Sequence, residues 1–268
     1  MIIYGRNPVH EALRGRRAHH VSEVWATESA AKELWLAGLK ARVCSADDIA
    51  RRCGSEAHQG ICAEAGGYPY IGPDELLAVE SPLIVALDQV QDPQNLGSIC
   101  RTAECAGATG VVIPERRSAE VTPAVCKASA GAVEHLCIAR VRNVADFLVE
   151  ASRAGCWSYG ASAPAGPEAH GAGDDRRGSS PGRGVEQASR SHDGKSPVAY
   201  TAPDYRGGVV LVLGSEGSGL RPRVAASCDE LVSLPMRGRI ESLGVAAAAA
   251  ALLYGILQSR EIVLDKAP

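Results

Sequence analysis

Residues 209–220 read VVLVLGSEGSGL, an uninterrupted apolar run followed at once by a loop with glycines at 214, 217 and 219. Such a run predicts a β-strand buried on both faces, as strands of parallel sheets are. Ligands of open α/β sheets bind at the carboxyl ends of the strands. The loop Gly214–Leu220 is therefore a candidate binding site, and a bare turn without a ligand is the alternative.

The chemistry of this loop differs from that of phosphate-binding loops. No Gly-Lys-Ser/Thr follows it, and its glycines do not fit the G-x-G-x-x-G spacing. The carboxylate of Glu216 would repel phosphate and suits hydroxyl or amine groups better. A nucleotide-phosphate hydrolase is therefore disfavoured, also because metal-binding carboxylates are missing.

A second junction reads DQVQDPQNLGSICR at residues 88–101, directly after an apolar strand predicted at 83–87. We expect Asn95 to cap a helix over about 97–106. Arg101 then lies within that helix, and its guanidinium could hold a phosphate or a ribose hydroxyl. An ion pair with Glu104 or another carboxylate on a solvated face is the alternative.

A third junction reads LPMRGRIESLGV at residues 234–245, between a strand predicted at 230–234 and an alanine-rich helix predicted at 243–258. Ser242 is predicted to cap this helix. Free backbone amides at the helix start would favour a polar ligand.

Composition narrows the function classes. The 268-residue chain has 28 basic and 31 acidic residues, a net charge of −3, and only 4% aromatic residues. This excludes nucleic-acid binding through bulk positive charge, leaves room for a local basic patch, and disfavours an aromatic base-stacking platform. The nine cysteines form no C-x-x-C pair, which indicates free thiols in a reducing cytoplasm and no metal site. No apolar stretch approaches the ~18 residues that span a bilayer.

The chain divides into two α/β units. Residues 1–70 form a small domain, the Gly- and Pro-rich residues 71–82 a linker, and residues 83–260 a second domain. Residues 161–200 are rich in Gly, Ser, Ala and Pro and predict a flexible insertion. Further helices are expected at about 8–13, 32–41, 46–53, 122–132 and 144–154, and further strands at 21–25, 41–44, 61–65 and 110–113.

Together the three clusters resemble the three motifs of the SpoU/TrmH (SPOUT) class of RNA ribose 2′-O-methyltransferases. The joint occurrence of NLGSICR, LVLGSEGSGL and the segment from Pro235-Met236 to Ser242-Leu243 is specific, whereas each motif alone is weak. The stretches YGRNPVHEAL (4–13) and HQGICAE (58–64) resemble the substrate-binding domain of the RlmB-like branch, the rRNA (guanosine-2′-O)-methyltransferases. The resemblance covers residues 2–65 and 83–258 except the insertion.

The resemblance implies a fold and an activity. The N-terminal domain would be L30e-like and bind RNA, and the second domain would be an α/β-knot fold with a deep trefoil knot. The enzyme would be a homodimer that transfers a methyl group from S-adenosylmethionine to a ribose 2′-hydroxyl of RNA. Large-subunit rRNA guanosine is the implied target, tRNA the alternative substrate, and no membrane or metal takes part.

The resemblance also assigns residues. It implies catalytic roles for Asn95, Arg101, Glu216 and Ser242, and cofactor binding by Gly214, Gly217, Leu234, Met236 and Leu243. Arginine holds its proton strongly, so we expect Arg101 to clamp the target ribose and lower the pKa of its hydroxyl. Glu216 or a phosphate would then accept the proton.

RNA contacts are expected from the densest N-terminal basic cluster, Arg14, Arg16 and Arg17. A solvated helix end is the alternative for these arginines.

One departure of the chain from the family pattern bears on activity, while Ala246 also stands where a serine is common. Members usually have asparagine where this chain has Gly244. The second functional hypothesis is therefore a catalytically impaired RNA-binding or ribosome-assembly protein on the same scaffold.

Overall fold

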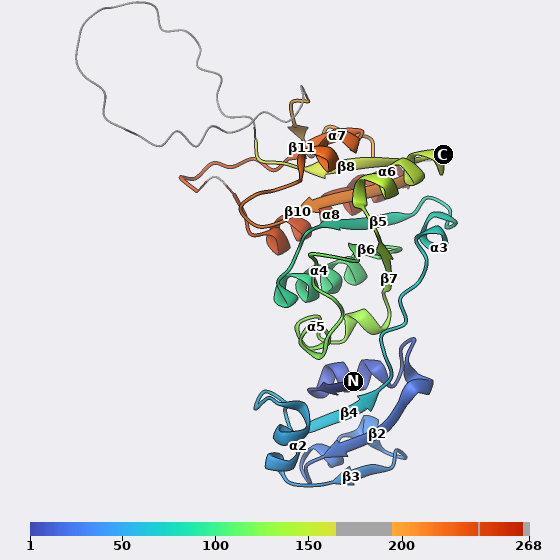
Figure 1. The fold of residues 1–268 in the computed structure, drawn as a ribbon, viewed down its shortest axis with the longest axis vertical. Coiled ribbons are helices and arrows are strands. Elements are labelled where there is room, and N and C mark those ends of the chain that lie inside the picture. The colour runs from blue at the N-terminus through green and yellow to red at the C-terminus, as the bar shows by residue number, and fades with distance from the viewer. Residues whose placement is uncertain (165–194, 241, 265–268) are drawn as a thin grey trace, which may run out of the picture.

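The computed structural model describes residues 1–164, 195–240 and 242–264. Two sheets, each with its own helices, follow one another along the chain (Figure 1). Most of the insertion predicted at 161–200, namely residues 165–194, lies outside the described residues.

The N-terminal unit is a four-stranded sheet in the order β1-β4-β2-β3. Only the β2–β3 pair is parallel. Its elements are β1 (Ile2–Tyr4), α1 (Arg6–Ala12), η1 (Ala18–His20), β2 (Val21–Ala26), η2 (Ala30–Lys32), η3 (Leu34–Leu36), β3 (Ala41–Val43), α2 (Ala46–Cys53) and β4 (Ile61–Ala65).

One helix predicted for this unit is wrong. Residues 32–41 form no α-helix, because Glu33 adopts an extended backbone that separates the short 3₁₀ turns η2 and η3. The apolar spacing instead serves packing, since the Trp35 ring lies against the His10 ring in a tilted arrangement, with ring centroids 4.7 Å apart. By contrast, α2 lies where it was predicted: Ser45 accepts a hydrogen bond from the Asp48 amide (3.1 Å), and Gly54 ends the helix with φ 64°.

The second unit is a seven-stranded, wholly parallel sheet in the order β7-β6-β5-β10-β8-β11-β9. Strands β5, β6 and β7 extend the sheet in one direction, and β8 to β11 are added on the other side of β5. The strand order therefore reverses between β5 and β10. Its elements are β5 (Leu83–Asp88), α4 (Pro93–Cys105), β6 (Gly110–Pro114), α5 (Pro123–Ala128), η4 (Ala132–Glu134), β7 (Cys137–Val141), α6 (Val144–Arg153), β8 (Cys156–Ala161), β9 (Val198–Ala199), β10 (Gly208–Gly214), α7 (Pro222–Ser227), β11 (Glu230–Ser233) and α8 (Val245–Leu264).

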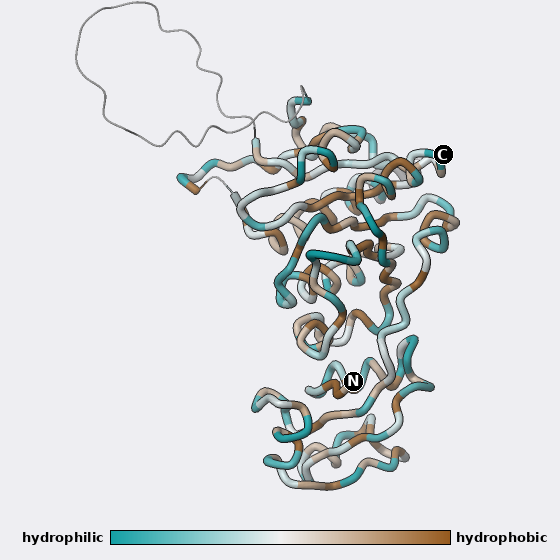
Figure 2. Tube along the Cα trace, in the orientation of Figure 1, coloured by the Kyte–Doolittle hydropathy of each residue, from teal (hydrophilic) through white to brown (hydrophobic). Residues whose placement is uncertain are grey.

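Helices cover both faces of this sheet. Alternate residues of β5 and β10 face α4 and α8, and the others face α6 and α7. Both sets are fully buried, which is why these strands read as continuous apolar runs. The hydropathy trace shows this concentration along the central strands (Figure 2). Of the helices in the described part of the chain, none is long and apolar enough to cross a bilayer.

The segment predicted as a linker is structured. Residues 71–82 contain α3 (Pro73–Leu77), whose Leu76 is buried against the second sheet's core. The Ile71 amide donates a hydrogen bond to the carbonyl of Ile138 in β7 (3.0 Å). The Gly- and Pro-rich composition thus marks turns held against the second unit.

The two units also share a buried polar contact. Arg17 is fully buried, and its Nε donates to Glu134 Oε2 at 2.8 Å while Nη1 donates to the Gly66 carbonyl at 3.1 Å. The Tyr68 hydroxyl lies within 2.9 Å of the Val133 and Leu136 carbonyls. Burial alone would lower the pKa of Arg17, but its hydrogen bond and charge interaction with Glu134 raise it.

The prediction that Arg17 contacts RNA is therefore wrong, because its side chain is buried. A sequence cluster of arginines does not show which members face water, and here only Arg14 and Arg16 are exposed.

Candidate functional site

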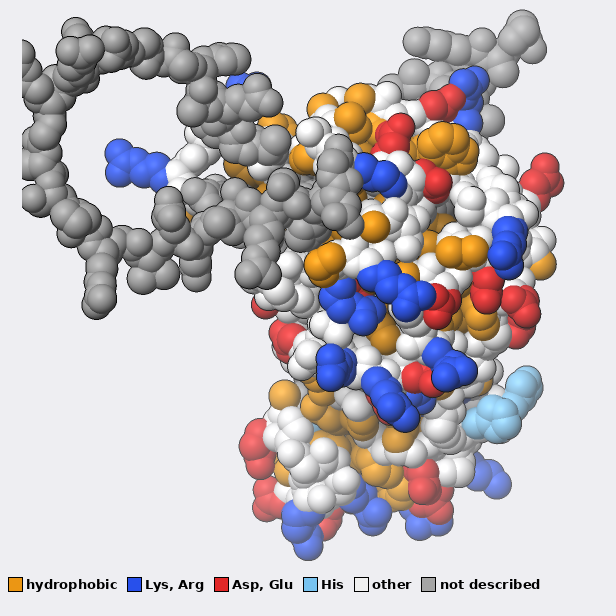
Figure 3. All heavy atoms as spheres, turned by 45° about the horizontal axis from the view of Figure 1, so that its top comes forward, with side chains coloured by type: hydrophobic (Ala, Val, Ile, Leu, Met, Phe, Trp, Pro, Cys, Tyr) orange, Lys and Arg blue, Asp and Glu red, His pale blue; other side chains and the backbone are white. Residues whose placement is uncertain are grey.

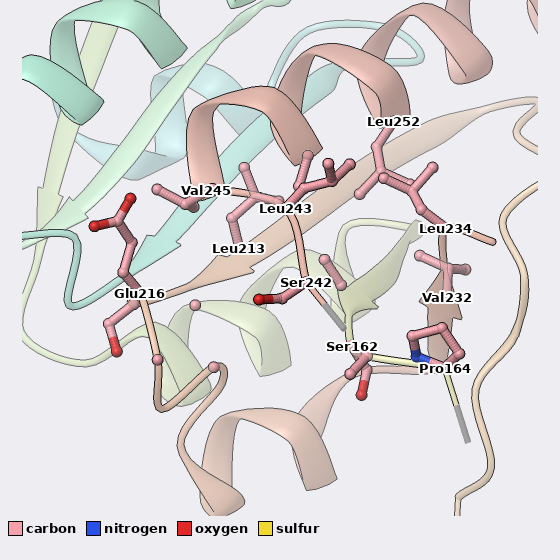
Figure 4. A pocket seen from close by; sticks show the side chains of 18 of the residues that line it. Ser162, Pro164, Leu213, Glu216, Val232, Leu234, Ser242, Leu243, Val245 and Leu252 are labelled. Carbon is pink, nitrogen blue, oxygen red and sulfur yellow. The ribbon is translucent and has the colours of Figure 1, made fainter. Parts of the chain in front are cut away.

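A cavity of about 320 Å³ opens at the carboxyl ends of β8, β10 and β11 (Figure 4). Its walls come from the glycine-rich loop, from Ala161–Pro164 and from the segments on either side of residue 241. Leu213, Val232 and Leu252 form a buried apolar floor. The cavity thus lies beside the reversal of strand order, where open α/β sheets bind ligands.

Seven of the nine residues assigned to catalysis or cofactor binding line this cavity. They are Gly214, Glu216, Gly217, Leu234, Met236, Ser242 and Leu243. The second and third sequence clusters therefore meet in space although residues 221–233 separate them along the chain.

The glycine-rich loop is braced by its own backbone. Ser215 and Gly219 exchange two backbone hydrogen bonds, of 3.1 and 3.0 Å. A Cβ on Gly214 would lie 2.1 Å from the Gly219 carbonyl carbon, so only glycine fits there. The glycine at 214 is thus required by a contact within the loop itself, a reason that the sequence pattern alone did not reveal.

A buried carboxylate anchors the far end of this loop. Asp88, the last residue of β5, accepts hydrogen bonds from the Arg221 amide (2.9 Å) and from Arg221 Nε (2.8 Å). Arg221 is the residue from which α7 starts. This role of Asp88 was not predicted from the sequence, although its place at the end of a buried strand was the available signal.

Polar side chains at the cavity are few. Glu216 and Ser242 are exposed, and neither side chain has a hydrogen-bond partner within the described residues. Both extend into the region between the loop and the start of α8 (Figure 4). A Cβ on Gly244 would lie 3.7 Å from Glu216 Oε1, so the residue at 244 faces this carboxylate.

Ser242 is not the cap of α8. The helix begins at Val245, and its first backbone bond runs from Ala248 to the Gly244 carbonyl (3.0 Å). The cap prediction is wrong because the alanine-rich pattern does not mark where the helix starts. The Ser242 hydroxyl is consequently free to face the cavity.

The first sequence cluster contributes differently. Asp92, not Asn95, caps α4 by accepting a hydrogen bond from the Gln94 amide (3.0 Å), and Pro93 occupies the first helical position. The cap prediction for Asn95 is therefore wrong.

Asn95 and Arg101 do not line the cavity of this chain. Arg101 is exposed and, within the described residues, pairs with neither Glu104 nor any other group.

Cysteine chemistry is absent from the described part of this site. Burial raises the pKa of Cys100 in α4 and of Cys228 after α7 to about 12, so both are neutral packing groups. All nine cysteines are free thiols. Among the described residues no group of His, Cys, Asp and Glu is arranged to hold a metal ion.

Two family profiles match this chain. The SpoU rRNA Methylase family matches residues 82–254, and the RNA 2′-O ribose methyltransferase substrate-binding family matches residues 2–71. The chain therefore belongs to the SpoU methylase family, a family of tRNA and rRNA methyltransferases, and it carries that family's substrate-binding module.

Similar sequences and solved structures support the same family assignment. The chain is 37% identical over 211 residues to a putative TrmH family tRNA/rRNA methyltransferase, YacO, of Bacillus subtilis, covering 77% of this chain and 72% of the relative. It is 31% identical over 283 residues to a putative TrmH family tRNA/rRNA methyltransferase of Staphylococcus haemolyticus, covering 100% and 99%.

The fold is similar to that of the SpoU methyltransferase AviRb from Streptomyces viridochromogenes in complex with AdoMet (TM-score 0.71, 24% identity, 97% and 90% covered). It is also similar to that of an AdoMet-bound rRNA methyltransferase from Sinorhizobium meliloti (TM-score 0.70, 23% identity, 96% and 86% covered).

Proposed function

We propose that this protein transfers a methyl group from S-adenosylmethionine to a ribose 2′-hydroxyl of RNA, with a large-subunit rRNA guanosine as target. The observation that carries the proposal is the cavity, in which two separate family motifs converge on one exposed carboxylate. The substrate-binding module at residues 2–71 supports RNA as the partner. The protein would act in the cytoplasm, where its free thiols stay reduced.

The cavity fits such a cofactor. Its volume is at the small end of the range for small-molecule sites, which suits a compactly folded ligand. Leu213, Val232 and Leu252 offer an apolar floor to an adenosine ring, while the backbone of Gly214, Gly217 and Leu243 offers hydrogen bonds. Leu234 and Met236 would close the remaining wall.

Glu216 gives the cavity a negative charge, which matches a sulfonium cation. When bound, the cofactor supplies a methyl group that its positive charge has already activated.

The protein's own part in catalysis is mainly to position the hydroxyl, which can contribute on the order of 7–11 kcal/mol. We assign Arg101 as the clamp on the target ribose and Glu216 as a proton acceptor, with Asn95 and Ser242 as polar contacts. A carboxylate base contributes about 10²–10⁴-fold to such a step.

Arg101 lies outside the cavity of its own chain, so a homodimer is part of the proposal. A second copy would bring its Arg101 to the cavity mouth. Exposed apolar side chains near that mouth and on α8 support a subunit contact there: Ile240, Leu243 and Tyr254 are 75%, 47% and 50% exposed. The deep knot implied by the family resemblance belongs to the same proposal.

The test is transfer of labelled methyl groups from S-adenosylmethionine to purified rRNA and, separately, to tRNA. We expect transfer to rRNA and a loss of about 10²-fold or more in Glu216→Gln. Glu80→Gln is the matched control, because Glu80 is an exposed carboxylate at the opposite edge of the sheet. Absence of transfer to either RNA would favour the impaired RNA-binding protein.

Mapping 2′-O-methyl groups in cells with and without the gene identifies the target. A lost rRNA guanosine mark supports the proposal, whereas a lost tRNA mark assigns the alternative substrate.

A further inference from the structure

Three exposed arginines lie together where β6 and β7 end. Arg116 and Arg117 follow β6, and Arg142 follows β7. Pro114 and Val141 are paired in register, and the Glu115 amide donates to the Val141 carbonyl at 2.8 Å, which holds the two loops side by side. Within the described residues none of the three guanidinium groups has a hydrogen-bond or ion-pair partner.

The local charge is positive on a chain that is negative overall. The acids next to these arginines along the chain are Glu115, which is exposed, Glu120, which pairs with Arg140 at 2.9 Å, and Asp146, which pairs with Arg223 at 2.6 Å. With those two paired arginines included, five arginines against three acids leave a local charge of +2, whereas the whole chain carries −3. Such a patch attracts polyanions selectively to this surface.

The patch and the cavity share one edge of the sheet. In the strand order β7-β6-β5-β10, β6 is two strands and β7 three strands from β10, at whose carboxyl end the cavity lies. With neighbouring strands about 4.8 Å apart, the ends of β6 and β7 that carry the arginines lie roughly 10–15 Å from the end of β10. Figure 3 shows Lys and Arg side chains gathered in the middle of the face that it presents.

The opposite side of the sheet, where the amino ends of the strands lie, is negatively charged. The segments that lead into the strands carry Asp74, Glu75, Glu80, Glu104, Asp204, Asp229 and Glu230. Four basic residues lie at the same ends of the strands, namely Arg153, Lys195, Arg206 and Arg260, and Arg206 pairs with Asp204. Seven acids against four bases leave a charge of −3 there. A polyanion is therefore directed to the edge that holds the cavity and repelled from the other.

We propose that Arg116, Arg117 and Arg142 form a phosphate-binding subsite for the RNA backbone flanking the target nucleotide. The inference rests on the proposed function for the identity of the polyanion. Guanidinium groups bind phosphate through paired hydrogen bonds. Such contacts fix the position of the RNA strand without reading its sequence.

The test compares Arg116→Gln/Arg117→Gln/Arg142→Gln with a control of equal charge, Arg153→Gln/Lys195→Gln/Arg206→Gln, whose residues are exposed before the amino ends of β8, β9 and β10, outside both the cavity and the substrate-binding module. The probe is a fluorescently labelled single-stranded RNA of mixed sequence, titrated at several salt concentrations. Three lost phosphate contacts at about 0.7 each should reduce the slope of log Kd against log salt by about 2. The control should keep the wild-type slope.

A second readout is kinetic. The subsite variant should raise KM for rRNA and keep kcat and S-adenosylmethionine binding, because its residues lie outside the cavity. An unchanged salt slope, or a fall in kcat at unchanged KM, would overturn the subsite.

The two proposals fail separately. Wild-type methyl transfer with an unchanged slope in the variant removes the subsite alone. A reduced slope without any wild-type methyl transfer removes the enzymatic function and keeps the subsite.

Discussion

Glu216 Oε1 lies 3.7 Å from the point that a Cβ on Gly244 would occupy. The backbone at Gly244 is not in the left-handed region, so a larger residue can adopt it without strain. We predict that Gly244→Asn places an amide beside the carboxylate. A hydrogen bond to a charged group contributes about 1.5–3 kcal/mol. If it orients Glu216 in the transition state, methyl transfer should rise about tenfold or more.

Gly244→Ala is the control for this prediction, because it adds the Cβ in ordinary contact but no amide. Steady-state methyl transfer to rRNA measures both variants. Equal rates for the Asn and Ala variants would show that the residue at 244 does not act through Glu216.

Arg101→Lys tests the clamp. Lysine keeps the positive charge but lacks the planar guanidinium group that binds in a bidentate manner. We expect a fall of about 10²-fold in kcat/KM with unchanged S-adenosylmethionine binding, since Arg101 does not line the cavity. Arg153→Lys, at an exposed arginine on α6, controls for the substitution. Full turnover by Arg101→Lys would exclude a bidentate clamp.

The buried Arg17–Glu134 pair should dominate the stability of the contact between the units. Removing one partner leaves a buried charge unpaired, which costs about 3–5 kcal/mol. We therefore expect Arg17→Met to lower the free energy of unfolding by that amount in urea titrations. The double variant Arg17→Met/Glu134→Leu should recover most of the loss, because it leaves no buried charge. A double variant as unstable as the single one would contradict this account.

Gly97 in α4 should tolerate no side chain. A Cβ there would lie 2.4 Å from Ala128 Cβ and 3.0 Å from the Val125 carbonyl oxygen in α5. We predict that Gly97→Ala lowers the free energy of unfolding by about 1–3 kcal/mol through overpacking. Gly67→Ala is the matched control, since nothing lies within 4 Å of its added methyl group. Urea unfolding of both variants checks the prediction, and equal stabilities would refute it.

Acid should weaken the contact between the two units, because Glu11 of the first unit pairs with His135 of the second at 2.7 Å. Burial alone would raise the pKa of Glu11, but the hydrogen bond to His135 and nearby positive charges lower it below its ordinary value of 4.5. The folded state thus favours the carboxylate. Its contribution is present above pH 4.5 and is lost as the pH falls through the lowered pKa.

Measurement of the unfolding free energy between about pH 6 and 3 checks this effect. Glu11→Gln should show a shallower loss than wild type, and Glu28→Gln, at an exposed residue, should follow wild type. Parallel curves for all three proteins would count against the pair.

The sequence predicted those parts of the fold that depend on local pattern. Buried parallel strands are continuous apolar runs, so β5 and β10 were located from the sequence to within one residue at each end. The three clusters also pointed to one edge of one sheet, because parallel strands place their carboxyl ends together. Seven of the assigned residues accordingly line one cavity.

Contacts between distant segments were beyond local pattern. Arg14, Arg16 and Arg17 look alike in sequence, yet Glu134, over one hundred residues away, makes Arg17 a core residue. The requirement for glycine at 214 likewise arises from Gly219. Asp92 and Asn95 are both good capping residues, and Pro93 at the first helical position decides between them.

The Arg17–Glu134 pair also bears on how the protein can be divided. A fragment that starts at β5 would keep Glu134 but lose its guanidinium partner, exposing a carboxylate in an apolar surface. The second unit expressed alone would therefore be less stable than it is in the full chain. Fusions and truncations of this protein should accordingly keep the two halves together, or replace Glu134 whenever the first half is removed.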